Sequence, residues 1–176
     1  MCDPDPKLGC YSDTGAWDRW GFPLPETSTK IGTKFYLYTR GYSSSQTIHY
    51  NSPSTISGSR FNGNRDTKII IHGFNSDSSS AWMHNMKNAF MTKGYFNVIL
   101  VDWGNGAQTG IDYDQASANT RVVGDQVGEL IKALPTSKSR VHLIGHSLGA
   151  HTSSFASKLL ASYNKIERCF LIYFSI

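Results

Sequence analysis

The stretch VHLIGHSLGAH, residues 141–151, decides the fold. An apolar, β-prone run leads into the pattern Gly-x-Ser-x-Gly, and a helix-compatible stretch, residues 150–163, follows it. A strand, a sharp turn and a helix in this order are what a nucleophile elbow requires. We therefore expect Ser147 to sit at a tight turn, with unfavourable backbone angles and an exposed hydroxyl.

Two glycines make such a turn feasible. Gly145 and Gly149 remove the side chains that would collide where the strand meets the helix. The helix directs its free N–H groups and the positive end of its dipole toward the serine, where an oxyanion would form. The pattern alone is common, but its place between a strand and a helix favours an elbow over a simple turn.

Sequence patterns on both sides of this turn predict an α/β fold. Short apolar runs are typical of strands buried in a parallel sheet, and apolar residues at helical spacing predict helices. Strands that alternate with helices indicate an open, mostly parallel sheet with right-handed crossovers. We expect strands at residues 34–40, 46–50, 67–72, 96–101, 140–144 and 166–173, helices at 81–92, 113–134 and 150–163, and a loop at 51–65.

The composition predicts one globular domain. Of the 176 residues, 39% are hydrophobic and 12% aromatic, which suffices for a packed core. We expect an irregular N-terminal arm over residues 1–30, a core over 31–168 and a divergent apolar tail over 169–176. Aromatic residues of the arm are expected to pin it to the core: Trp17, Trp20 and Phe22.

The distribution of charge argues against a nucleic-acid-binding protein, and the cysteines are consistent with an extracellular one. The net charge is +4, but no run of Lys and Arg predicts a nucleic-acid or polybasic membrane site. Cys2 and Cys10 bracket a Pro-rich loop and could close a short disulfide. That bond would indicate an oxidising, extracellular compartment, with Cys169 left as the odd thiol. No signal peptide and no apolar run of transmembrane length is visible.

Several motifs, in order, resemble those of the pancreatic lipase family of α/β-hydrolases. The resemblance extends from about Cys10 to about Arg168 and predicts the α/β-hydrolase fold. Because the motifs occur in the right order, together they are far more specific than any one of them. They are GCYSD at 9–13, SGS at 57–59, IHGF at 71–74, VDW at 101–103, NTRVVG at 119–124 and GHSLGAH at 145–151.

The resemblance implies a secreted serine carboxyl-ester hydrolase that acts on triacylglycerols or phospholipids at a lipid interface. It implies that Ser147 is the nucleophile and that the backbone N–H groups of Phe74 and Leu148 form the oxyanion hole. This agrees with the elbow, where one donor follows the nucleophile and the other ends a neighbouring strand. No cofactor and no metal are implied.

The sequence departs from the family after the nucleophile. The acid and the histidine of the triad should follow Ser147 in that order, but no Asp does, and the only later histidine is His151. We therefore expect a C-terminally truncated catalytic domain with little or no activity, because a serine hydroxyl without a base is a poor nucleophile. The alternative is a non-catalytic, lipase-like protein that binds lipid or a partner.

Other polar residues near the motifs are expected to be structural. We expect His72 to support the oxyanion loop from behind, and Asp102 to cap a backbone turn. His146 precedes the nucleophile on a strand, so its side chain should point away from it and be buried. A zinc site on His72, His142 and His146 is disfavoured, because no ligand motif accompanies them. His151 is expected to be a packing residue near the helix start, not a substitute base.

Overall fold

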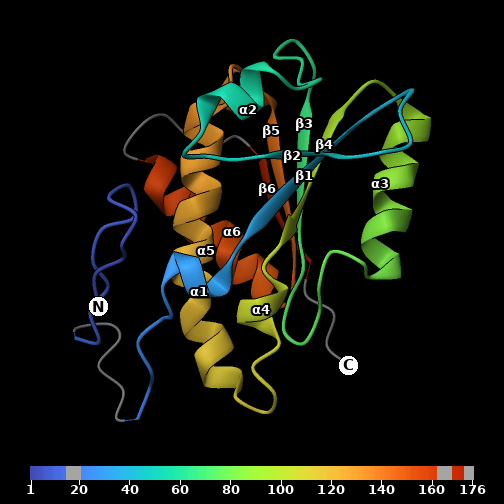
Figure 1. The fold of residues 1–176 in the computed structure, drawn as a ribbon. Helices are drawn as coiled ribbons and strands as arrows, with labels where there is room; N and C mark the ends of the chain where they lie inside the picture. Colours follow the sequence, from blue (N-terminus) through green and yellow to red (C-terminus); the bar gives the residue numbers. More distant parts are fainter. Residues whose placement is uncertain (15–20, 162–167, 173–176) are drawn as a thin grey trace.

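The fold is built on one mixed sheet, seen in a computed structural model that describes residues 1–14, 21–161 and 168–172 (Figure 1). Its six strands have the order β2-β1-β4-β3-β5-β6. From β4 to β6 all neighbours are parallel, whereas β1 pairs antiparallel with both β2 and β4. The strands are β1 (Lys34–Thr39), β2 (Gln46–Ile48), β3 (Thr67–Ile71), β4 (Asn97–Asp102), β5 (Val141–His146) and β6 (Arg168–Ile172). The expected mostly parallel α/β sheet is confirmed.

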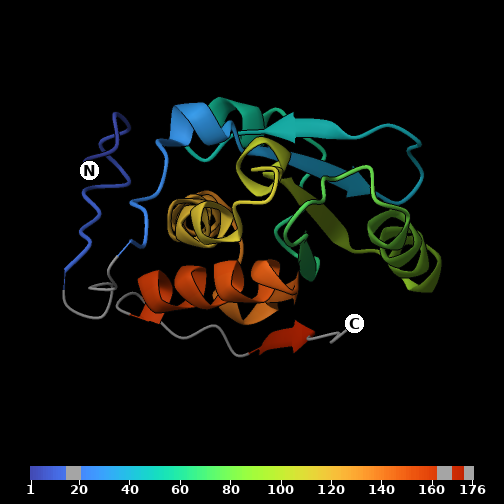
Figure 2. The ribbon, with the colours of Figure 1, turned by 90° about the horizontal axis from the view of Figure 1, so that it is seen from below.

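Helices cover both faces of the sheet (Figure 2). α5 (Tyr113–Ala133) and α6 (Leu148–Ala161) pack together on one face, and α3 (Ala81–Lys93) lies on the other. In β3, Ile69 and Ile71 belong to the core under α5 and α6, whereas Ile70 faces α3. Burial on both faces explains why this strand is a continuous apolar run. In the described part of the chain, no helix combines the length and apolarity needed to cross a bilayer.

The longest helix, α5, forms for reasons visible in its sequence. The side chain of Asp112 accepts a hydrogen bond from the Gln115 N–H at 2.9 Å and caps the first turn. The helix ends just before Pro135, which disfavours helical angles at the residue preceding it. The apolar stripe is buried as expected: Val123, Val127, Leu130, Ile131 and Leu134.

Four short helical segments in the described residues have no counterpart in the sequence prediction. They are α1 (Ser28–Ile31), α2 (Pro53–Ser57), α4 (Gly104–Ala107) and the 3-10 helix η2 (Lys138–Arg140). The expectation of a loop over residues 51–65 is therefore wrong at α2. Pro53 supplies a fixed φ suited to the first helical position. Each of these helices is too short for an apolar stripe to repeat, so hydrophobic periodicity does not reveal it.

The N-terminal arm is fastened to the core by a few specific contacts. A disulfide joins Cys2 to Cys10. The buried Tyr11 donates its hydroxyl proton to the Asp125 carboxylate of α5 at 2.8 Å. Burial raises the pKa of Asp125, so this carboxylate depends on its hydrogen-bond donor. The expected anchors Trp17 and Trp20 lie outside the described residues.

Removing the Tyr11 hydroxyl should loosen the arm. We expect Tyr11→Phe to lower the free energy of unfolding at pH 7 by about 1–3 kcal/mol, because Asp125 keeps its burial and loses its donor. Chemical denaturation measures this change. The exposed Tyr42 offers a matched control, whose Phe variant should stay within about 0.5 kcal/mol of the parent. Equal effects of the two substitutions would contradict the assignment.

Candidate functional site

The site is organised around a backbone outlier. Ser147 has a φ of 54°, a left-handed value that is uncommon for a residue with a side chain. It lies between the last residue of β5 and the first residue of α6, and its own carbonyl accepts the Ala150 N–H at 2.8 Å. Ser147 is half-buried, and the sequence-predicted sharp turn is present. Such strain persists only where the surrounding structure enforces it.

Close backbone contacts enforce this turn. A Cβ on Gly145 would lie 2.2 Å from the carbonyl oxygen of Gly149, on the first turn of α6. A Cβ on Gly149 would lie 2.2 Å from the carbonyl oxygen of Ile71, at the end of β3. The backbones of β5, α6 and β3 therefore touch directly, and both glycines are required by space.

The loop after β3 lies against the serine turn. β3 and β5 are parallel neighbours with Ile71 opposite Gly145, so the residues that follow both strands meet at one edge of the sheet. A Cβ on Gly73 would lie 2.8 Å from the Ser147 Cβ and 3.2 Å from the Leu148 nitrogen. The structure thus brings the segment that ends in Phe74 beside Ser147 and Leu148.

The two amides that the sequence predicts as oxyanion donors, those of Phe74 and Leu148, have no backbone acceptor among the described residues. Leu148 is the first residue of α6, where an N–H has no acceptor within its own helix. Within the described residues, neither its amide nor that of Phe74 donates to a backbone oxygen in the surrounding loops. The next residue, Asn75, has a φ of 51° and donates to the Ala107 carbonyl at 3.0 Å. This bond to α4 fixes the loop that carries Phe74.

His72 supports that loop from inside the protein, as expected. The fully buried ring places Nδ1 3.0 Å from the Gly73 carbonyl, and the Trp103 N–H donates to Nε2 at 3.1 Å. These contacts assign the proton to Nδ1. The Trp103 indole stacks on the imidazole and donates to the His72 carbonyl at 2.9 Å. The prediction of a structural role for His72 is confirmed.

Asp102 caps a turn, which is also the role expected for it. Its carboxylate accepts the Gly104 N–H at 3.0 Å and the Ser78 hydroxyl at 2.7 Å. The His72 Nε2 is 3.8 Å away, beyond hydrogen-bond distance. The hydroxyl of Ser78 and the amide of Gly104 donate to the carboxylate and hold the pKa of Asp102 well below its ordinary value, although partial burial acts in the opposite direction.

Two further histidines, His146 and His151, flank the serine turn in the sequence. His146 packs its ring against Trp82 of α3 with 5.3 Å between centroids. It is half-buried, so the expectation of a buried side chain is wrong, because Trp82 covers the ring only in part. His151 is exposed on α6. Across the described residues, no three His, Cys, Asp or Glu side chains are gathered as metal ligands.

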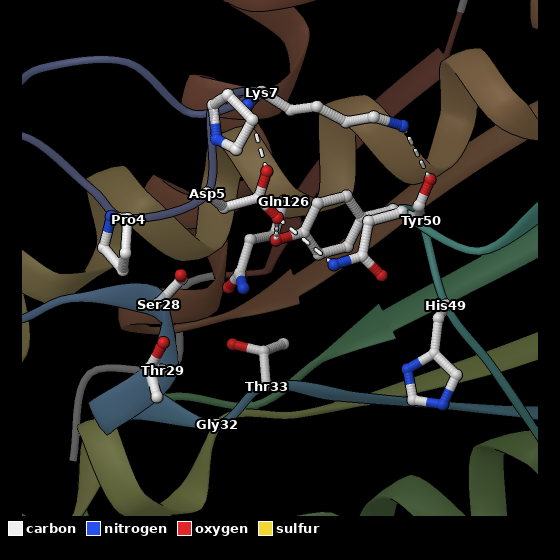
Figure 3. A pocket seen from close by; sticks show the side chains of 12 residues that line it. Pro4, Asp5, Lys7, Ser28, Thr29, Gly32, Thr33, His49, Tyr50 and Gln126 are labelled. Atoms are coloured by element: carbon white, nitrogen blue, oxygen red, sulfur yellow. Dashed lines mark hydrogen bonds between the residues drawn. The ribbon is translucent and has the colours of Figure 1, made fainter.

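A polar cavity of about 600 Å³ lies elsewhere, between the N-terminal arm and the core (Figure 3). Asp5 accepts the Tyr50 hydroxyl at 2.6 Å, and the Lys7 Nζ donates to the Tyr50 carbonyl at 3.2 Å. Burial and the bond to Asp5 raise the pKa of Tyr50. Sequence reasoning missed this cavity, because its walls come from segments far apart in the chain. Its lining includes no residue of the serine turn, and its charged groups fasten the arm.

A parallel strand pair, a strained serine turn and a following helix together define an α/β-hydrolase. The chain belongs to the Lipase family, whose sequence model matches residues 6–170. The predicted resemblance is thereby confirmed.

The chain is similar to several named pancreatic lipases and related proteins. It is 44% identical to pancreatic lipase-related protein 2 of Cavia porcellus over 87% of its length, and 41% identical to pancreatic triacylglycerol lipase of Mus musculus over 86%. It is also 39% identical to inactive pancreatic lipase-related protein 1 of Homo sapiens over 90% of its length. The matches cover 37%, 34% and 36% of these relatives, so the chain spans about a third of their length.

Adding one methyl group at the turn should test the backbone contacts. We expect Gly149→Ala to destabilise the fold by about 3 kcal/mol or more, because its Cβ would overlap the Ile71 carbonyl. Gly110 is the control, since it has a φ of 70° but nothing within 4 Å of an added Cβ. Gly110→Ala should cost only the strain of its angle, about 1–2 kcal/mol. Thermal unfolding compares them, and a smaller loss at Gly149 would contradict the contact.

The lowered pKa of Asp102 predicts an acid-dependent stability. Because the folded value lies below the unfolded one, the contribution is present above pH 4 or so and is lost as pH falls. The Asp102→Asn variant should be less stable at pH 7 and lose less stability below about pH 5. Denaturation curves at several pH values measure this slope. Parallel pH profiles for the two proteins would contradict the assignment.

Proposed function

We propose that the chain carries the nucleophile and the oxyanion hole of a serine carboxyl-ester hydrolase of the lipase type. The observation that carries this proposal is the left-handed Ser147 beside the Gly73 backbone, which a binding protein would not need. Triacylglycerols or phospholipids at a lipid interface are the proposed substrates. The printed name of one relative, pancreatic triacylglycerol lipase, supports the first of these.

The proposed chemistry is attack of the Ser147 hydroxyl oxygen on an ester carbonyl. The carbonyl oxygen becomes an oxyanion, and the N–H groups of Phe74 and Leu148 are its proposed donors. Fixed donors of this kind stabilise the transition state because they need no reorientation as charge develops. Loss of one such donor typically costs ~3–4 kcal/mol of transition-state stabilisation.

The attack also requires a base that takes the serine proton. The sequence given contains no Asp after Ser147. It contains one histidine after Ser147, His151, and this residue is exposed. We therefore expect a polypeptide limited to these 176 residues to turn over esters far more slowly than a complete triad, with only the oxyanion donors and substrate binding to sustain the reaction.

Secretion is part of the same proposal. The Cys2–Cys10 disulfide supports it, because such bonds persist in oxidising compartments. The names of the relatives refer to the pancreas, an organ that secretes enzymes, in agreement with this view.

A second candidate function is a non-catalytic, lipase-like protein that binds lipid or a partner. One observation favours it: a relative at 39% identity bears the printed name inactive pancreatic lipase-related protein 1. In this candidate the serine turn remains part of the fold, but it does not activate the Ser147 hydroxyl.

Chemical rescue separates the two candidates. A fluorophosphonate forms a bond from its phosphorus to the serine oxygen, fluoride leaves, and a base takes the hydroxyl proton. Imidazole in the buffer supplies the base. We expect slow phosphonylation of Ser147 that imidazole accelerates at least tenfold, because the oxyanion donors activate only that serine. Peptide mass spectrometry identifies the modified residue.

Two controls accompany this test. Ser147→Ala should abolish the imidazole-dependent label, and Ser78, which is engaged by Asp102, should remain unmodified. Random modification of surface serines, or an unmodified Ser147 at high imidazole, would refute the hydrolase proposal and leave the binding candidate.

A further inference from the structure

Basic residues that are scattered in the sequence come together at one end of the sheet. We call this surface the arginine–tyrosine edge and define it by Arg40, Tyr42, Arg60, Arg65 and Tyr95. It occupies the β1–β2 turn and the segments leading into β3 and β4, at the upper end of the sheet in Figure 1. Because β5 runs parallel to β3, the serine turn lies at the opposite end.

The register of three strands creates this gathering. Thr39 pairs with Asn97, and Asn97 pairs with Thr67, so the ends of β1, β4 and β3 lie side by side. Arg40 directly follows Thr39. Tyr95 lies two residues before Asn97, and Arg65 lies two residues before Thr67. Neighbouring strands are about 4.8 Å apart, so the three residues occupy a short row.

Guanidinium groups cover the two exposed tyrosine rings. The Cζ atoms of Arg40 and Arg65 lie 4.8 and 5.2 Å from the centroid of the Tyr95 ring. Beside them, the Cζ of Arg60 lies 4.2 Å from the centroid of the Tyr42 ring. Tyr95 is 64% and Tyr42 59% exposed, so both stacks face solvent.

In the part of the chain that the structure describes, no ion pair balances the charge of these arginines. Arg140 at the same end of the sheet pairs with Asp66 at 3.6 Å, but within the described residues no carboxylate forms an ion pair with Arg40, Arg60 or Arg65. Three positive charges are therefore held together without compensation, and such a field attracts an anionic partner.

Hydrogen bonds hold this surface in place before any partner arrives. The fully buried Asn97 accepts the Asn62 N–H at 3.1 Å and donates to the Asn62 carbonyl at 2.9 Å, which fixes the loop that leads to Arg65. The Arg60 guanidinium donates to the Ser44 carbonyl at 2.7 Å and closes the β1–β2 turn. Preorganisation lowers the entropy that binding would otherwise cost.

We propose that the arginine–tyrosine edge docks an acidic peptide segment of a protein partner. Guanidinium forks match carboxylates in a bidentate geometry, and Arg and Tyr are enriched at the energetic centres of protein interfaces. The rings already carry guanidinium groups on their faces, so the free guanidinium edges are what a ligand meets. A row of three strand ends spans about 10 Å, which three to four residues of an extended peptide cover.

Fluorescence anisotropy tests this docking with a defined probe. The probe is a fluorescein-labelled octapeptide of alternating glutamate and serine, compared with a peptide in which glutamine replaces glutamate. The glutamate peptide should bind at low salt and lose affinity as salt screens the charges. The double substitution Arg40→Gln with Arg65→Gln should weaken binding roughly tenfold.

A matched control and two contrary outcomes complete the test. Lys34→Gln removes a cation from the start of β1, opposite Asp102 at the other end of the sheet, and should leave binding unchanged. Thermal unfolding of each variant confirms that the fold is intact. Equal binding of the two peptides, or of the double variant and its parent, would overturn the proposal. So would binding to phosphatidylserine vesicles without binding to the peptide, which would assign the surface to a lipid headgroup.

Discussion

The rest of the structure depends on the direct contact of three backbones. Where β5 turns into α6, the carbonyl of Gly149 lies where a Gly145 side chain would be, and the carbonyl of Ile71 lies where a Gly149 side chain would be. No side chain separates β3, β5 and α6 at this point. The chain can pass through so narrow a space only with a sharp turn, and Ser147 carries the left-handed φ that results.

The buried side chains of His72 and Trp103 fix the end of β3 beside the Ser147 turn. His72 and Trp103 stack inside the protein, and Trp103 donates two hydrogen bonds to His72, so the end of β3 and the end of β4 cannot move independently. Asp102 also holds the loop before α3, because its carboxylate accepts a hydrogen bond from the Ser78 hydroxyl. The Gly73–Phe74 segment therefore rests on a rigid support, as fixed oxyanion donors require. The Asp102 carboxylate thus holds loops in place, whereas the proposed reaction takes place at the Ser147 turn.

Features that depend on residues close together in the chain could be predicted from the sequence, whereas contacts between distant residues could not. The elbow motif and the apolar run of β3 are local signals, and both predicted the structure well. The single-turn helix α2 left no periodic signal, because five residues cannot repeat a stripe. The Tyr11–Asp125 anchor joins residues more than a hundred positions apart, and no local pattern marks it. The arginine–tyrosine edge was missed for the same reason, since strand register alone gathers its charges.

In the proposed site, the hydroxyl oxygen of Ser147 faces the N–H groups of Phe74 and Leu148. The most direct test is a crystal structure of the chain with a phosphonate bonded to Ser147. The account predicts a φ near 54° at this serine, with the phosphonyl oxygen about 3 Å from the nitrogen atoms of both Phe74 and Leu148. A serine with negative φ, or a phosphonyl oxygen that contacts neither nitrogen, would contradict it.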